Sequence, residues 1–124
     1  MARTEIVACV IVGLCVSAGV ASCTREHPIT VGSKNFTEQV VVGEIVAQHL
    51  EHRLARRIDR KLNLGGTMLA HQALVRGEID LYPEYTGTAL TAILKLPPAH
   101  DPAAGIALVR GEYQARFGLE WLDP

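Results

Sequence analysis

The sequence predicts an α/β fold in which a mostly parallel sheet carries flanking helices. Two observations carry this prediction. Short apolar and β-branched runs alternate along the chain with longer stretches of helical periodicity. Strand alternating with helix implies right-handed crossovers between parallel strands, and no internal repeat suggests a solenoid instead.

The first predicted strand is Ile29–Val31, which ends at Gly32. A helix follows and runs to about Ala55, with Asn35 as its N-cap and Glu38 as the capping-box partner. Apolar or small residues keep one face of this helix inward, at positions 36, 40, 43, 47, 50 and 54.

Residues 56–64 alternate loosely and predict a more exposed second strand. The turn Gly65-Gly66-Thr67 then caps a second helix over residues 68–76, which Gly77 ends. A third strand is predicted over Ile79–Tyr82.

Pro83 cannot donate to a strand ladder and ends the third strand. A third helix, capped by Thr86 or Thr88, is expected to continue to about residue 95. Asp101 followed by proline opens a fourth helix that runs to about residue 117, where Gly118 stops it. Residues 119–122 are expected to begin another strand.

The first 22 residues predict a lipoprotein signal peptide. The charge-free apolar run Ile6–Val20 is shorter than the roughly 20 residues that span a bilayer, and small residues follow it. The segment Val20-Ala21-Ser22-Cys23 resembles a bacterial lipobox, in which Cys23 receives the lipid. We therefore expect residues 23–28 to be a polar tether and the domain to be exported, as a periplasmic or cell-surface lipoprotein anchored to the membrane.

Two alternatives stay open, namely an ordinary signal peptide cut elsewhere and a short membrane anchor. In the lipoprotein interpretation Cys9 and Cys15 are removed with the signal, so the exported domain contains no free thiol and no disulfide.

Composition excludes two classes of protein. Twelve Lys and Arg residues oppose thirteen Asp and Glu residues, and the net charge of -1 provides no basic field for a nucleic acid. A hydrophobic content of 48% argues against a disordered chain.

The strand-to-helix turns of such a sheet gather at one edge, where ligands bind. They supply the ammonium of Lys34, several hydroxyls, helix N-terminal amides and the phenol rings of Tyr82 and Tyr85. This set suits a small zwitterion: Lys34 and Thr88 satisfy a carboxylate, and aromatic faces hold a quaternary ammonium. One ring contributes only about 0.5–2 kcal/mol, so several are required.

Structural alternatives exist for most of these residues. Lys34 is also consistent with a solvated turn lysine, and Tyr82 is better explained as a core residue. Glu38 is interpreted as a helix cap and Glu84 as a surface carboxylate, rather than as an acid/base pair. The glycine turn at 65–67 lacks the spacing of a phosphate-binding loop.

An enzyme, a metal centre and a cofactor are not expected. His49 and His52 lie one helical turn apart but read as exposed helix positions, and neither they nor His71 belong to a metal-binding motif. No nucleophile, base and orienting residue can be assembled into a catalytic set.

Three blocks of sequence resemble the substrate-binding protein of ABC transporters for glycine betaine, choline, carnitine and related osmoprotectants. The likeness covers about residues 29–124, and the blocks occur in the order and spacing of the family. They are Val31-Gly32-Ser33-Lys34-Asn35-Phe36-Thr37-Glu38-Gln39, Asn63-Leu64-Gly65-Gly66-Thr67 and Gly77-Glu78-Ile79-Asp80-Leu81-Tyr82-Pro83-Glu84-Tyr85-Thr86-Gly87-Thr88.

The resemblance implies a type II periplasmic binding protein, whose two lobes close around the solute and deliver it to a membrane permease. Residues 29–124 are then the N-terminal part of the first lobe. Tyr85 matches one wall of the family's tyrosine cage, and Lys34 and Thr88 are similar to residues that hold the ligand's carboxylate.

Members of the family are well over twice as long, so we expect a C-terminally truncated member that closes incompletely. The later rings, Tyr113 and Trp121, are interpreted as core residues. A truncated fragment or pseudogene-like lipoprotein without transport activity is the alternative.

Overall fold

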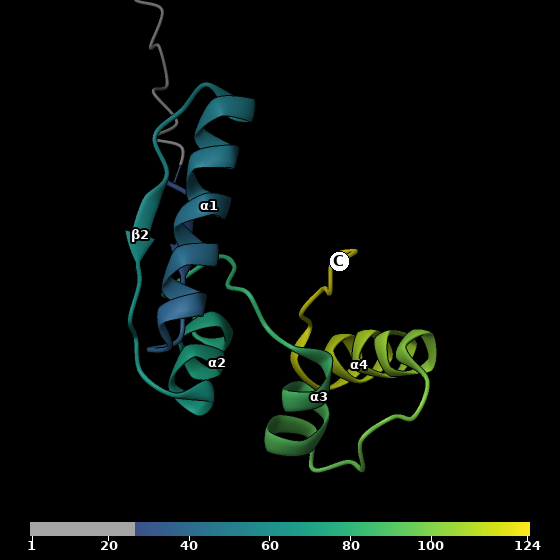
Figure 1. Cartoon of the computed structure of the whole chain (residues 1–124). Helices are drawn as coiled ribbons and strands as arrows, with labels where there is room; N and C mark the ends of the chain where they lie inside the picture. Colours follow the sequence, from purple (N-terminus) through teal and green to yellow (C-terminus); the bar gives the residue numbers. More distant parts are fainter. Residues whose placement is uncertain (1–26) are drawn as a thin grey trace, which may run out of the picture.

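The computed structural model describes residues 27–124, and its elements follow the predicted order (Figure 1). The predicted signal peptide and Cys23 lie outside the described residues. The elements are β1 (Thr30–Gly32), α1 (Thr37–Leu54), β2 (Asp59–Lys61), α2 (Thr67–Val75), α3 (Thr86–Thr88), the π-helix η1 (Ala89–Leu94) and α4 (Pro102–Phe117).

The sheet is parallel, as the sequence predicts, with β1 between two neighbours. On one side Val31 pairs with Arg60 of β2. On the other side Val31 forms a parallel bridge with Leu81, and the N–H of Gly32 donates to the carbonyl of Leu81 at 2.8 Å. The third predicted strand is thus reduced to one bridge, because Pro83 has no N–H with which to extend the ladder.

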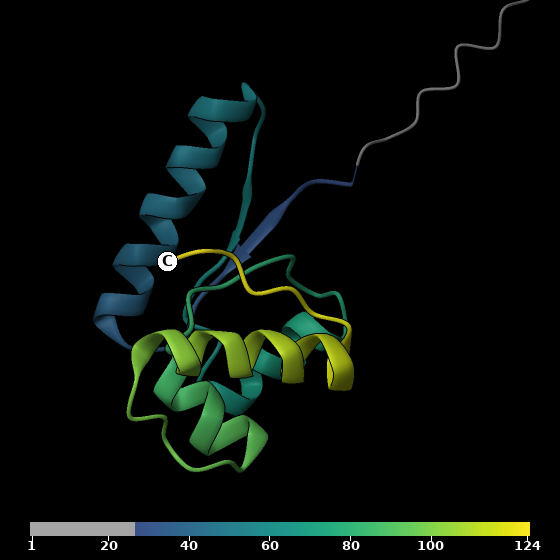
Figure 2. The ribbon, with the colours of Figure 1, turned by 90° about the vertical axis from the view of Figure 1, so that its right-hand side faces the viewer.

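Helix α1 packs along the sheet, where Val31, Ala47 and Ile58 form a buried core (Figures 1 and 2). A Cβ placed on Gly43 would lie 2.9 Å from Leu62 Cδ2 and 3.4 Å from the carbonyl oxygen of Gly32. The helix therefore approaches the sheet more closely at Gly43 than a larger residue would allow. Two positions predicted to face inward are exposed, at the two ends of the helix: 36 and 54.

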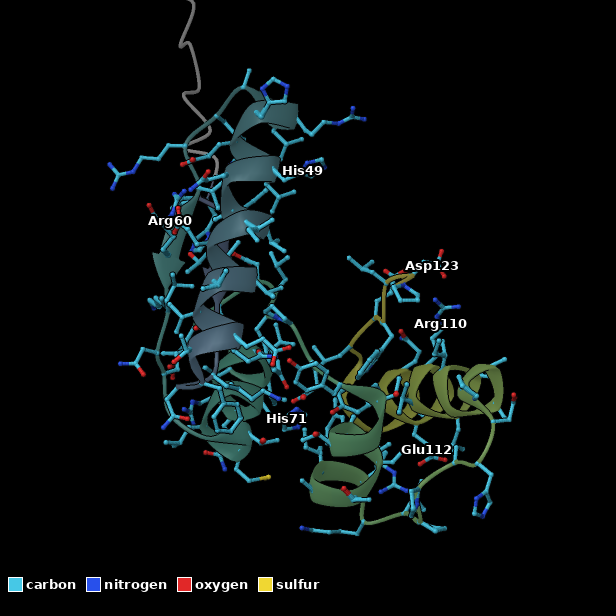
Figure 3. The ribbon with its side chains drawn as sticks, viewed as in Figure 1. His49, Arg60, His71, Arg110, Glu112 and Asp123 are labelled. Carbon is cyan, nitrogen blue, oxygen red and sulfur yellow. The ribbon has the colours of Figure 1, made fainter. Side chains whose placement is uncertain are left out.

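A second hydrophobic core lies between η1 and α4. Its buried members are Ala89, Leu90, Leu94, Val109 and Tyr113. Helix α2 contributes the buried residue His71 to this core, and its ring lies 4.6 Å from that of Phe117 and 5.6 Å from that of Tyr113. Figure 3 shows His71 at the side of α2 that faces α3 and α4.

The predicted N-caps of two helices are wrong. Phe36, not Asn35, is the N-cap of α1, and no side chain caps that end. Tyr85 stands at the N-cap of α3, so neither predicted threonine caps it.

The predicted start of α4 is confirmed by the Asp101 carboxylate, which accepts from the N–H of Ala104 at 2.8 Å. Gly118 ends this helix with a φ of 66°, in the left-handed region that favours glycine. Residues 119–122 form no strand, contrary to the prediction. Within residues 27–124, no helix combines the length and apolarity needed to cross a bilayer.

Candidate functional site

The first two strand-to-helix turns are bonded together at the carboxyl edge of the sheet. The N–H of Asn35 donates to the carbonyl of Gly65 at 2.9 Å. Ser33 receives two bonds from the second turn: its hydroxyl accepts from the N–H of Asn63 at 2.9 Å, and its carbonyl accepts from the N–H of Leu64 at 3.0 Å. The predicted gathering of turns at one edge is therefore present.

A buried ion pair joins the third turn to the first. The ammonium of Lys34 contacts the carboxylate of Glu84, and the two side chains are only 1% and 5% exposed. Glu84 also accepts from the backbone N–H of Tyr85 at 2.8 Å and from the hydroxyl of Tyr82 at 3.1 Å. One carboxylate thus holds an ammonium, a phenol and the backbone of the residue whose ring was predicted to face the ligand.

These contacts overturn the structural interpretation of two residues and modify that of a third. Lys34 is not a solvated lysine, because it is buried and paired. Glu84 is not a surface carboxylate, because its side chain is almost completely covered. Tyr82 is half-buried rather than fully in the core, and its hydroxyl is used by Glu84.

Tyr85 lies above the Lys34 ammonium, with 5.0 Å between the nitrogen and the centre of the ring. The ring of Phe36 is 5.8 Å from the same nitrogen. Both distances are within the range of a cation–aromatic interaction. Tyr85 is also 43% exposed, so part of its ring is open to solution while Lys34 contacts it from below.

The hydroxyl of Tyr85 donates to the carboxylate of Glu38, which therefore is not a helix cap. This bond raises the pKa of Tyr85 above its ordinary value. Burial, followed by the charge of Glu84, raises the pKa of Tyr82 as well. Both phenols are consequently neutral at physiological pH and act as hydrogen-bond donors.

Gln39 is a site residue that the sequence analysis missed. It is 1% exposed, and within residues 27–124 neither its Nε2 nor its Oε1 has a hydrogen-bond partner. The Gln39 amide lowers the pKa of Tyr85 and so partly offsets the effect of Glu38. Buried polar groups normally find partners, so an amide with two free atoms is suited to a ligand. The sequence signal that could have identified Gln39 is its position one turn before Gly43, on the inward face of α1.

The structure brings Lys34 and Tyr85 into contact. Thr88 is half-buried in α3, one turn beyond Tyr85. Among residues 27–124, no hydrogen bond connects the Thr88 side chain to the other two residues. The Lys34 ammonium, which the sequence assigned to a ligand carboxylate, is already engaged by Glu84.

A cavity of about 830 Å³ adjoins these turns, between α1, residues 80–86 and the segment that follows α4. Glu84, Tyr85 and Thr86 belong to its lining, whereas Lys34 and Gln39 do not. Tyr82 also lines the cavity, and much of the remaining lining is apolar.

The later rings pack as predicted. Tyr113 is 3% exposed, and its ring lies 5.4 Å from that of Trp121. His49 and His52 are exposed on α1, and no group of three or more potential metal ligands occurs in the described part of the chain.

Residues 27–124 match the model of the OpuAC family, described as the substrate binding domain of an ABC-type glycine betaine transport system. The chain belongs to this family. The family consists of transport substrate-binding domains and is not a class of enzymes.

Several named relatives are more than 30% identical to this chain. The ergothioneine transport permease/ergothioneine binding protein EgtU of Helicobacter pylori is 39% identical over 100 residues, which are 79% of this chain and 17% of that protein. The carnitine transport binding protein OpuCC of Listeria monocytogenes is 31% identical over 101 residues, 81% of this chain and 33% of that protein. The chain thus spans about a third or less of these relatives.

Solved structures give the same result for the fold. Apo YehZ from Escherichia coli superposes with a TM-score of 0.65 at 34% identity, covering 78% of this chain and 35% of that one. A glycine betaine/carnitine/choline ABC transporter structure superposes with a TM-score of 0.66 at 23% identity, covering 78% and 36%. The predicted fold, part of a type II periplasmic binding protein, is confirmed.

Proposed function

We propose that this OpuAC chain is part of the extracytoplasmic solute receptor of an ABC importer for quaternary ammonium osmoprotectants such as glycine betaine, choline and carnitine. The chain would contribute one wall of the ligand site and deliver the solute to a membrane permease. Cys23 would carry the lipid that anchors the protein to the membrane.

The observation that carries this proposal is the half-exposed ring of Tyr85 at the edge where three turns meet. A quaternary ammonium cannot donate a hydrogen bond, so an aromatic face is its natural partner. Tyr85 is held in place within the protein, because its hydroxyl donates to Glu38 and its backbone N–H donates to Glu84.

Gln39 and Thr88 are proposed to bind the other end of a zwitterion. The amide of Gln39 offers a donor, and the hydroxyl of Thr88, one helical turn beyond Tyr85, offers another. An amide and a hydroxyl can satisfy a carboxylate without adding charge. The names of the relatives, which include carnitine, glycine betaine and ergothioneine binding, support ligands of this class.

Nuclear magnetic resonance titration of the chain in a non-ionic detergent tests the proposal. Choline is compared with 3,3-dimethyl-1-butanol, its uncharged tert-butyl isostere. We expect millimolar binding of choline and glycine betaine, with the largest shifts at the amides of Gln39, Tyr85 and Thr88. The isostere should bind more weakly, and equal binding would show that apolar contact alone holds the ligand.

Substitution of the aromatic wall provides the second test. Tyr85→Ala should weaken the binding of choline by about 1–2 kcal/mol through loss of one ring. Leu54→Ala is the matched control, because Leu54 is similarly exposed but lies at the opposite end of α1. Unchanged affinity in Tyr85→Ala would remove this residue from the site.

A further inference from the structure

We propose that Glu84 determines which net ligand charge the site accepts, because it neutralises Lys34 directly beneath Tyr85. This inference rests on the proposed function, in which Tyr85 holds a quaternary ammonium. It assigns the buried pair a role in specificity that is separate from direct contact with the ligand.

The geometry places a fixed ammonium on one face of the aromatic wall. The Lys34 nitrogen lies 5.0 Å from the centre of the Tyr85 ring, and its side chain is 1% exposed. A ligand cation must therefore use the part of the ring that Lys34 leaves open. The ligand and Lys34 would then be two positive charges separated by one aromatic ring.

Without compensation, this arrangement repels the ligand. A cation bound within about 5 Å of the ring would stand roughly 10 Å from the lysine nitrogen. At an effective dielectric constant of about 20, repulsion at that distance weakens binding roughly tenfold. The carboxylate of Glu84, in contact with Lys34, cancels most of this field.

Further hydrogen bonds hold the Glu84 carboxylate next to Lys34, where it compensates the charge of the ammonium. Its carboxylate also accepts from the Tyr85 N–H at 2.8 Å and from the Tyr82 hydroxyl at 3.1 Å. The carboxylate is thus fixed relative to both the ammonium and the ring. Glu84 is a positioning residue for Tyr85 as well as the source of the compensating charge.

The effect depends on the net charge of the ligand. Choline is a cation, so it experiences the full repulsion of an unpaired Lys34. Glycine betaine carries a carboxylate in addition, and its attraction to Lys34 offsets the repulsion of the ammonium. The ratio of choline affinity to glycine betaine affinity therefore measures the charge beneath Tyr85, whereas a change in ring position would affect both ligands alike.

Three variants of the full chain change the net charge of the Lys34–Glu84 pair. Glu84→Gln leaves Lys34 unpaired, Lys34→Met leaves Glu84 unpaired, and the double variant removes both charges with little change in shape. We expect the choline to glycine betaine ratio to fall about tenfold in Glu84→Gln, to rise in Lys34→Met and to return close to its wild-type value in the double variant. Nuclear magnetic resonance titrations of each variant with both ligands give the ratio.

The titrations distinguish failure of this inference from failure of the proposed function. Equal ratios in wild type and variants that still bind would overturn the inference and leave the proposed function standing. Absence of binding by the wild-type chain would overturn both. If Glu84→Gln fails to fold, a higher ratio in Lys34→Met than in the double variant supports the inference, and equal ratios in these two variants refute it.

Discussion

The close approach of α1 to the sheet at Gly43 makes a quantitative prediction about stability. Replacing a helix-interior glycine by alanine normally stabilises a helix by about 0.5–1 kcal/mol. At Gly43, however, the added methyl group would lie 2.9 Å from Leu62 Cδ2, 3.3 Å from Ser33 Cβ and 3.4 Å from the Gly32 carbonyl oxygen. The leucine can move, but the other two atoms belong to β1 and the turn that follows it.

Overpacking of this kind costs about 1–3 kcal/mol, which exceeds the gain in helix propensity. We therefore expect Gly43→Ala to lower the free energy of unfolding by about 1 kcal/mol and Tm by about 4–8 °C. Gly111 provides the matched control, because it is exposed within α4 and an added Cβ there meets nothing within 4 Å. Gly111→Ala should raise Tm by a few degrees.

Thermal unfolding followed by circular dichroism measures both changes. The reasoning would be refuted if Gly43→Ala stabilised the chain as much as Gly111→Ala does. That result would mean that α1 can shift away from the sheet without loss. The position of Gln39, one turn earlier on the same helix, would then be less firmly set than the structure indicates.

Three further predictions concern packing and charge. Burial lowers the pKa of His71 below its ordinary 6.5, so on acidification the unfolded chain takes up a proton before the folded chain does, and the free energy of unfolding should fall as pH drops below about 6.5. Urea titrations should show that His71→Phe removes this pH dependence, whereas replacement of the exposed His49 does not. Arg60 lowers the pKa of Glu51 to about 2, so the free energy of unfolding should decrease as pH falls from about 4.5 to 2. If this free energy depended on pH as steeply in Arg60→Met as in the wild type, the prediction would be contradicted. Within the described part of the chain the buried hydroxyl of Tyr113 has no hydrogen-bond partner, so Tyr113→Phe should raise the free energy of unfolding by about 1 kcal/mol in urea titrations. A decrease would show that the hydroxyl is satisfied.

The sequence predicted the elements that depend on local chemistry. Asp101 before a proline and Gly118 after the last turn determine both ends of α4 by capping and by backbone conformation. The short strand at residues 30–32 follows from β-branched residues before a glycine. Each of these signals acts within a few residues of the place where it is read.

Long-range pairing was the part that local patterns did not predict. Glu38 fits a capping box by spacing, but in the structure it accepts from Tyr85, 47 residues away. Glu84 reads as a surface carboxylate because nothing nearby in sequence covers it, and its buried partner Lys34 is 50 residues away. The unpaired amide of Gln39 becomes visible only when burial is known.

The two hydrophobic cores have a consequence for how the molecule opens. One lies under α1 and the other between η1 and α4, and His71 reaches from α2 into the second through contacts between ring edges. Separately packed clusters can unfold locally with different free energies. Amide hydrogen exchange should therefore divide the chain into two cooperative units, with the η1–α4 unit exchanging through its own openings. Tyr85 stands at the boundary between these units, so the orientation of its ring depends on both remaining closed.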